Sequence, residues 1–174
     1  MAGERGTQLR DAAPADFPAI LALNDAEVAH TSAMDMARLR QLHGYAGWHR
    51  VAVVDGAVAA FLLAMRDGCG YVNPNFDWFA ARYPRFLYVD RVVVGAGFQG
   101  LGLGSQLYRE LFEQARRQQV PVIACEYNLQ PPNAASQAFH DRFGFREVGS
   151  QWLDGGAKRV SLQVAELTSS APDA

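Results

Sequence analysis

The pattern of hydrophobic and polar positions divides the chain into helical and extended segments. Apolar residues recur at helical spacing between 17 and 28, where Asp16 and Pro18 are typical of a helix start. A second short helix is predicted next, with Thr31 or Ser32 as its N-cap. Its buried face would carry Met36, Leu39 and Leu42. The chain is therefore expected to begin with two helices.

From residue 50 the period changes to that of β-strands. Residues 50–54 and 57–64 are apolar runs joined by Asp55 and Gly56, a dipeptide typical of a tight hairpin turn. β-Branched and aromatic residues fill 86–94 and predict a third strand.

Helices and strands alternate in the second half of the chain. A helix from about 105 to 119 carries an apolar stripe, and 122–127 is a short buried strand. Asn133 is expected to cap a further helix that Gly144 ends. A hairpin that turns around 154–156 closes the chain.

This order of elements predicts a single α/β domain over residues 1–174. Hairpin strands pair antiparallel, and a parallel pair needs a crossover helix, which joins only 86–94 and 122–127. We therefore expect a mixed, mostly antiparallel sheet flanked by helices. The small polar ends, about 1–7 and 168–174, are expected to fray.

Residues 66–85 form a long connection that is rich in both turn formers and aromatic residues. Connections of this length are uncommon in compact domains and are often lids or binding loops. The aromatic side chains have two interpretations, a wall of an acceptor site or a loop packed on the core or on a second subunit. They are Tyr71, Phe76, Trp78, Phe79 and Tyr83.

Composition and charge narrow the class of protein. Hydrophobic residues make up 49% and charged residues 20% of the 174, which is ordinary for a globular cytoplasmic protein. The net charge of −2 argues against a nucleic-acid partner, which would usually require a basic patch. No apolar run is long enough to span a membrane, and the N-terminus lacks the apolar core of a signal peptide. A cytoplasmic location is expected, and the sequence leaves open whether the protein forms a homodimer.

Cysteine and histidine positions predict no metal site. Of the two cysteines, Cys125 lies in an apolar run and is expected to be a small buried thiol. His30, His43 and His49 lack the spacing of metal ligands and are expected to lie at the surface or half-buried.

Two overlapping glycine patterns follow the strand that ends at Val94. The first, from Gly95 to Gly100, matches the G-x-G-x-x-G of dinucleotide-binding folds. Two features argue against a nicotinamide cofactor. Gly102 and Gly104 would fall inside the helix that this motif opens, and each would destabilise that helix by about 1 kcal/mol relative to alanine. Hairpins also stand where further βαβ units would be needed.

The second pattern, residues 99–105, leads directly into the predicted helix. Its glycines let successive backbone N–H groups converge at a helix N-terminus, which carries about half a positive charge. A pyrophosphate fits such a site without a lysine or a metal ion. No Gly-Lys-Ser/Thr follows, so this is not a nucleotide P-loop.

Gln99-x-x-Gly102-x-Gly104 resembles the pyrophosphate-binding signature of the GNAT superfamily of acyl-CoA N-acyltransferases. A second set of positions is similar to a later motif of that family: Asn133, Ser136, Phe139, His140, Phe143, Gly144 and Phe145. The resemblance is firm over about 86–146. It implies the family's α/β fold, in which the strands 86–94 and 122–127 form a parallel pair that splays apart.

The resemblance also implies acetyl-CoA as the acyl donor, with no metal, and a primary amine as acceptor. The pantetheine arm would enter between the two splayed strands. The residues implied in donor binding are Val92, Val94, Gln99, Gly100, Leu101, Gly102, Gly104, Ser105 and Asn133. Asn133 would reach the pantetheine or phosphate side, a role compatible with helix capping.

Acyl transfer to an amine needs a base for the acceptor, a donor to the oxyanion and a proton for the thiolate. Glu126, expected at the end of its strand, matches the general-base position of family members that acetylate protein N-termini. A solvated strand end or an ion pair is its other interpretation. Asp90 is the rival base, and the neighbouring Arg91 could be a simple charge partner.

The proton donor is where the sequence departs from the family pattern, because His140 stands where the family usually has tyrosine. Imidazole can donate a proton near neutral pH, so the role is expected to persist, with Tyr127 and Tyr88 as further candidates. His140 is expected beside a buried stripe of Phe139 and Phe143. A domain that binds acyl-CoA without catalysis is the alternative. A hydrolase triad is disfavoured because no Gly-x-Ser-x-Gly elbow exists.

Overall fold

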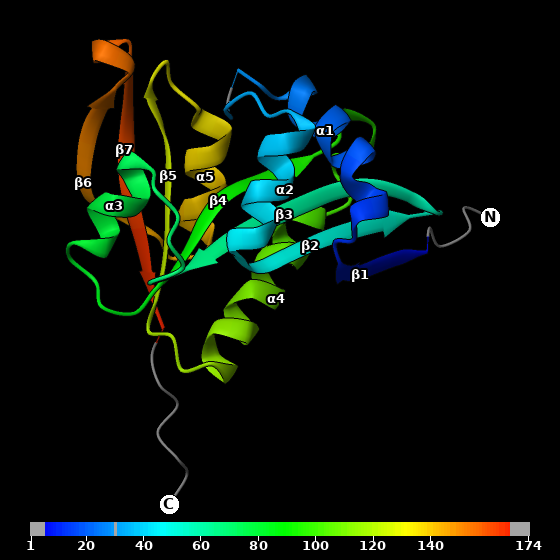
Figure 1. Cartoon of the computed structure of the whole chain (residues 1–174), viewed down its shortest axis with the longest axis horizontal. Helices are drawn as coiled ribbons and strands as arrows, with labels where there is room; N and C mark the ends of the chain where they lie inside the picture. The colour runs from blue at the N-terminus through cyan, green and yellow to red at the C-terminus, as the bar shows by residue number, and fades with distance from the viewer. Residues whose placement is uncertain (1–5, 30, 168–174) are drawn as a thin grey trace, which may run out of the picture. The chain divides into compact units, whose positions relative to one another are not determined.

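The computed structural model describes residues 6–29 and 31–167, and His30 lies outside them. Its strands form a seven-stranded sheet in the order β1-β2-β3-β4-β5-β7-β6 (Figure 1). The strands are β1 Thr7–Asp11, β2 Ala46–Val54, β3 Ala57–Arg66, β4 Leu87–Val94, β5 Val122–Gln130, β6 Arg146–Leu153 and β7 Lys158–Glu166. The α-helices are α1 Phe17–Ala26, α2 Met36–Tyr45, α3 Pro74–Ala80, α4 Leu103–Arg117 and α5 Ala134–Arg142. The predicted mixed α/β sheet is confirmed.

The chain forms two compact units that share the long elements β4 and α4. One unit comprises the described residues of Met1–Met65 and Val89–Leu111. The other comprises Arg66–Tyr88 and the described residues of Phe112–Ala174.

In the first unit, the predicted hairpin is confirmed as the antiparallel pair β2 and β3. Asp55 and Gly56 form its turn with φ values of 48° and 83°, the left-handed region that a two-residue hairpin requires. Most of β3 is fully buried, as its continuous apolar run predicts.

The first unit also contains a strand that the sequence did not predict. β1 pairs antiparallel with β2 from Thr7↔Val54 to Asp11↔Arg50. It has only five residues, mostly polar and exposed, so it has no hydrophobic periodicity. The expectation that the chain starts with two helices was therefore wrong, and the expected fraying at about 1–7 overlaps an ordered strand end at Thr7.

The cap of α2 also differs from the prediction. Asp35, not Thr31 or Ser32, accepts a hydrogen bond from the Arg38 backbone N–H at 2.7 Å. The helix begins one residue later, at Met36, which is only half-buried. Leu39 and Leu42 are fully buried as predicted.

In the second unit, β4 and β5 pair parallel through Leu87↔Ile123 and Tyr88↔Ala124, as the crossover helix requires. β7 pairs antiparallel with β5 on one side and with β6 on the other, which confirms the closing hairpin.

Part of the expected loop 66–85 is helical. Asn73 caps α3 by accepting hydrogen bonds from the backbone N–H groups of Asn75 and Phe76 at 2.9 and 3.3 Å, and Pro74 occupies the first turn. The helix has only seven residues, too few for a clear helical period, which is why the turn formers dominated the prediction.

Candidate functional site

The glycine loop begins with a residue that serves packing. The Gly95 N–H donates to the Ala59 carbonyl oxygen at 2.8 Å, directly after β4. A Cβ at Gly95 would lie 2.9 Å from Leu23 Cδ2 and 3.2 Å from Ala59 O. This glycine is therefore required by the close approach of β3 and α1, independently of any ligand.

The later glycines leave the loop open to a ligand. Gly100 and Gly102 have φ values of 83° and 72°, and a Cβ on either would meet no atom within 4 Å. α4 begins at Leu103, two residues before the predicted start, so Gly104 and Ser105 lie in its first turn. The dinucleotide pattern would need a helix that begins at Gly100, its last glycine. Because α4 begins only at Leu103, the structure disfavours the nicotinamide interpretation. Exposed glycines before a helix N-terminus fit a pyrophosphate.

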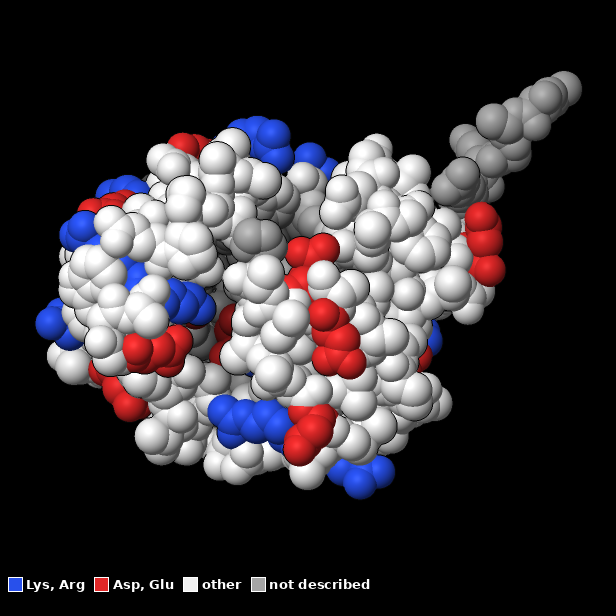
Figure 2. All heavy atoms as spheres, turned by 90° about the horizontal axis from the view of Figure 1, so that it is seen from above, with Lys and Arg blue, Asp and Glu red and all other residues white. Residues whose placement is uncertain are grey.

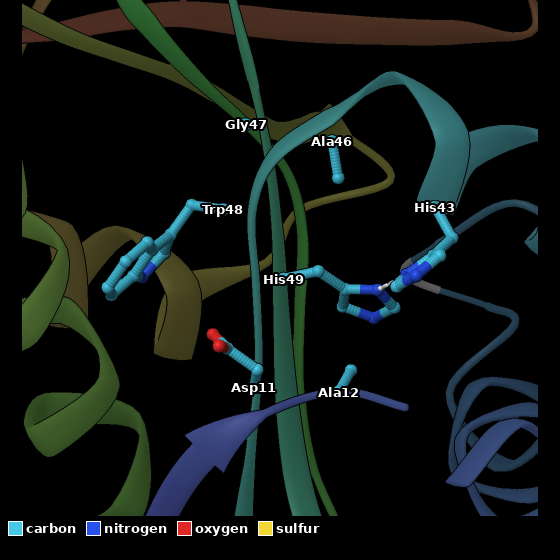
Figure 3. Close-up of a pocket in the computed structure, with 7 residues that line it drawn as sticks. All are labelled: Asp11, Ala12, His43, Ala46, Gly47, Trp48 and His49. Atoms are coloured by element: carbon cyan, nitrogen blue, oxygen red, sulfur yellow. Dashed lines mark hydrogen bonds between the residues drawn. The ribbon is translucent and has the colours of Figure 1, made fainter. Parts of the chain in front are cut away.

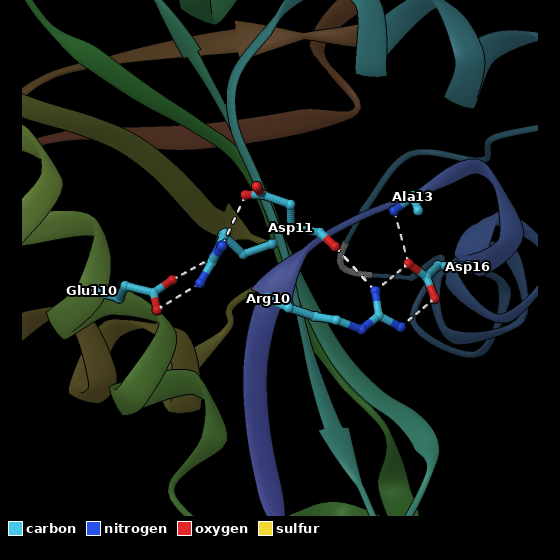
Figure 4. A network of polar contacts seen from close by, with 6 residues as sticks. Arg10, Asp11, Ala13, Asp16 and Glu110 are labelled. Atoms are coloured by element: carbon cyan, nitrogen blue, oxygen red, sulfur yellow. Dashed lines mark hydrogen bonds and ion pairs between the residues drawn. The ribbon is translucent and has the colours of Figure 1, made fainter.

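α4 is anchored to the sheet by a charged network in the first unit. The Arg50 guanidinium donates through Nε and Nη2 to both carboxylate oxygens of Glu110, at 2.6 and 3.0 Å, and through Nη1 to Asp11 Oδ1 at 2.8 Å (Figure 4). A bidentate ion pair of this kind fixes the relative orientation of the two side chains as well as the distance between them. It ties the helix that carries the glycine loop to β2.

A second guanidinium fork lies beside this network. Arg10 donates to both oxygens of Asp16 at 2.7 and 2.8 Å, and the Ala13 N–H donates to Asp16 at 2.8 Å (Figure 4). The hydrogen bonds from Arg10 lower the pKa of Asp16, although burial opposes the shift. Acidic and basic side chains also lie interspersed on the face shown in Figure 2.

Asp90, the rival base, is bound by a buried arginine. Arg91 is 8% exposed and donates from Nε to Asp90 Oδ2 at 2.8 Å. Its Nη1 donates to Asn24 Oδ1 at 2.9 Å and to the Ser32 carbonyl oxygen at 3.1 Å. The charge-partner interpretation of Arg91 is confirmed. The Asp90 carboxylate is therefore engaged with a buried cation, which gives it the structural role of a charge partner.

Glu126 lies within β5 and not at its end. β5 continues to Gln130 because it pairs with β7 along its length, including Glu126↔Leu162. The Tyr88 hydroxyl donates to Glu126 Oε2 at 2.7 Å. The expectation of a strand end was therefore wrong, because the polar residues after Tyr127 gave no sign of the long β5–β7 ladder.

Aromatic side chains from residues 66–85 pack around Tyr88 in the second unit. The rings of Phe76, Phe79 and Tyr71 have centroids 5.7, 6.0 and 6.5 Å from that of Tyr88. All four side chains are buried. Of the two interpretations of the aromatic segment, the structure supports packing in the core. We call these four residues the Tyr88 cluster.

Trp78 and Tyr83, the other two aromatic residues of the segment, are half-buried. A Cβ at Gly149 would lie 2.5 Å from Trp78 Cζ2, so this glycine makes room for the indole ring. The Arg82 guanidinium lies 3.8 Å from the centroid of the same ring, a cation–π contact.

His140 is the buried residue of α5. It is 4% exposed, whereas Phe139 and Phe143, expected to form the buried stripe, are half-buried. Its ring centroid lies 5.2 Å from Phe145 and 5.8 Å from Tyr127. The helix therefore turns its histidine inward, because Tyr127 and Phe145 supply an aromatic surface that periodicity within α5 could not reveal.

Geometry and burial define the protonation of His140. Its Nδ1 lies 2.7 Å from the Ser136 carbonyl oxygen, which can only accept, so Nδ1 carries the proton. Burial lowers the pKa of His140, and the bond to Ser136 only partly offsets this. The ring is therefore neutral at neutral pH, in contrast to the unperturbed histidine that the sequence suggested.

Tyr127 and Asn133 complete the predicted residues in the second unit. Gln163 Nε2 donates to the Tyr127 hydroxyl at 3.1 Å, and burial raises the pKa of this tyrosine. Asn133 accepts a hydrogen bond from the Ser136 N–H at 3.2 Å, which confirms the predicted cap. The structure thus brings Glu126, Tyr88, His140, Tyr127 and Asn133 into one unit. Asp90, Val92, Val94 and the residues 99–105 lie in the other.

A pocket of about 210 Å³ lies elsewhere in the first unit, at the ends of β1 and α2 and the start of β2. Trp48 and His49 project to opposite sides of β2 (Figure 3). His49 Nδ1 lies 2.8 Å from His43 Nδ1, and His49 is only 7% exposed. The expectation of a surface or half-buried histidine was wrong for His49, because the rings of Phe17 and Phe61 enclose it.

Among residues 6–29 and 31–167, no three His, Cys, Asp or Glu side chains gather as a metal site would require. Within the same residues, no helix has the length and apolar character needed to cross a membrane. Cys125 is buried as predicted, and burial raises the pKa of its thiol.

The model of the acetyltransferase (GNAT) family matches residues 9–145. The chain belongs to the GNAT family. Two relatives are L-methionine sulfoximine/L-methionine sulfone acetyltransferases. That of Pseudomonas aeruginosa is 30% identical and covers 94% of this chain and 98% of its own. That of Salmonella typhimurium is 29% identical and covers 95% and 98%. These matches make the protein an acetyltransferase enzyme.

Solved GNAT structures share the fold. The ribosomal-protein-S18-alanine N-acetyltransferase of Escherichia coli has a TM-score of 0.73 at 15% identity, covering 97% of this chain and 99% of its own. The yncA acetyltransferase of Salmonella typhimurium, solved with its cofactor acetyl-CoA, has a TM-score of 0.65 at 25% identity, covering 97% and 98%.

Proposed function

We propose that this GNAT enzyme transfers the acetyl group of acetyl-CoA to the primary amine of a small amino-acid analogue, with L-methionine sulfoximine and L-methionine sulfone as the first candidates. The observation that carries this proposal is the match to acetyltransferases of these two compounds at about 30% identity over nearly the whole of both chains. The acetyl-CoA named with the yncA structure supports the donor.

The donor is assigned to the glycine loop and the end of β4. Backbone N–H groups of residues 99–105 would surround the pyrophosphate at the N-terminus of α4, where the exposed glycines leave room. Val92 and Val94 would offer backbone groups to the pantetheine arm, and Asn133 would assist from the start of α5.

The reaction joins the acceptor nitrogen to the thioester carbon and breaks the carbon–sulfur bond. Glu126 takes the proton that the amine loses, and the hydrogen bond that its carboxylate accepts from the Tyr88 hydroxyl at 2.7 Å supports this role. A backbone N–H near Val94 would stabilise the oxyanion. His140 returns a proton to the coenzyme A thiolate, although its lowered pKa makes the charged form scarce at neutral pH.

An acceptor screen with detection of free thiol tests the proposal. Purified protein with acetyl-CoA is expected to release coenzyme A when L-methionine sulfoximine or L-methionine sulfone is added. It should release none with N-acetyl-L-methionine methyl ester, which has no free amine. Acetyl-CoA at 100 times its dissociation constant should add about 2.7 kcal/mol to the free energy of unfolding. NAD and ATP should not. Stabilisation by NAD alone would overturn the donor, and stabilisation by acetyl-CoA without turnover on any amine would favour the non-catalytic alternative.

A further inference from the structure

Tyr88 and Glu126 meet because of the parallel register of β4 and β5. Tyr88 is the register partner of Ala124, and Glu126 lies two residues further along β5, on the same face as Ala124. The hydroxyl can therefore reach along the sheet to Glu126 Oε2, at 2.7 Å. The contact follows from backbone register and does not depend on a flexible loop.

The Tyr88 cluster fixes the ring that makes this contact. Tyr88 is 1% exposed, and the rings of Phe76 and Phe79 pack against it at centroid distances of 5.7 and 6.0 Å. A ring packed in this way has few alternative rotamers, so its hydroxyl is held in place before substrate arrives. An ionised carboxylate accepts this hydrogen bond more strongly than the neutral acid would, because hydrogen bonds to a charged group are the stronger ones.

We propose that Tyr88 is a positioning residue that orients the Glu126 carboxylate and keeps it ionised for proton abstraction from the acceptor amine. This inference rests on the proposed role of Glu126 as base. Tyr88 does not exchange a proton with the substrate in this scheme. Its hydrogen bond stabilises the charged carboxylate over the neutral acid, so the base is ready at a lower pH than it would be without the bond.

Tyr88→Phe removes the hydroxyl and keeps the ring in the cluster. A hydrogen bond to a charged group is strong enough to move a titration midpoint by about one pH unit. The acidic limb of the kcat profile with acetyl-CoA and L-methionine sulfoximine should therefore move to higher pH by about one unit. Below the limb the rate should fall about tenfold relative to wild type, and at high pH it should return to the wild-type value.

Tyr83→Phe is the matched control, because it removes a half-buried hydroxyl from the ring next to Phe79. Its profile should coincide with that of wild type. In the Glu126→Gln background, Tyr88→Phe should have no further effect on kcat if it acts through the carboxylate. An equal loss at every pH in Tyr88→Phe, or a further loss in the double variant, would overturn the proposal.

A titration that needs no acceptor separates this inference from the proposed function. In an NMR spectrum of protein labelled with 13C at the glutamate carboxyl carbons, the signal of Glu126 is the one that disappears in Glu126→Gln. Its midpoint should rise by about one pH unit in Tyr88→Phe and stay unchanged in Tyr83→Phe. An unchanged midpoint in Tyr88→Phe would refute the inference even in an active enzyme. Full activity in Glu126→Gln would instead refute the proposed base.

Discussion

His49 allows a prediction of how stability depends on pH. Burial lowers the pKa of His49 from 6.5 to about 4, the proximity of His43 adds to this, and Asp16 opposes it. The two Nδ1 atoms lie 2.8 Å apart, so one ring donates an N–H to the other, and a proton on the accepting Nδ1 would set two N–H groups against each other. His49 is therefore neutral in the folded protein over a pH range in which the unfolded chain is protonated.

The sign and the size of the effect follow from the two pKa values. Above 6.5 both states are neutral and the stability is complete. As the pH falls from about 6.5 to about 4, the unfolded chain binds a proton that the folded protein excludes, so the free energy of unfolding decreases. Between about pH 7.5 and pH 5 the loss from His49 alone is about 2 kcal/mol. Such a loss lowers the urea midpoint by about 1 M for a protein of this size.

The assay compares wild type with His49→Asn, whose amide keeps a polar partner for His43 and does not titrate. Urea unfolding followed by far-UV circular dichroism is measured at about pH 7.5 and pH 5 for both proteins. Titrating groups that do not interact with His49, such as His140, are present in both proteins and cancel in the difference. Wild type should lose about 2 kcal/mol more than the variant between the two pH values. An equal loss in both proteins would show that His49 is not the source of the pH dependence, whatever the absolute stability of the variant.

The remaining predictions concern the donor loop and the catalytic groups. Gly100 and Gly56 share a φ of 83° and open space at the Cβ position, so replacing either with alanine should lower the free energy of unfolding by about 1 kcal/mol. Only Gly100→Ala should also weaken acetyl-CoA binding measured by calorimetry. Equal affinities in the two variants would show that the glycine loop is not part of the donor site. Glu126→Gln should lower turnover most at low pH and recover partly as the amine deprotonates unaided, whereas a uniform loss would indicate a structural role. His140→Phe should lower the rate about 100-fold, and His140→Tyr should move the alkaline limb toward about pH 10; coinciding profiles would make Tyr127 the donor.

The sequence alone determined the elements whose signals are local. The Asp55-Gly56 turn, the Asn133 cap and the glycines before α4 were all predicted, because each depends on the backbone preferences of a few adjacent residues. The two spaced motifs also identified the family, which the matched model and the relatives confirm. The donor and catalytic roles of individual residues stay predictions.

Tertiary structure decided the features that depend on partners far along the chain. β1 exists because the edge of β2 supplies its hydrogen bonds, and the full length of β5 comes from its ladder with β7. His49 and His140 are buried because rings from other elements enclose them, although their own neighbours in sequence suggested more exposed positions. The hydrogen bond from Tyr88 to Glu126 joins residues 38 positions apart. It results from strand register, which no local pattern of side chains specifies.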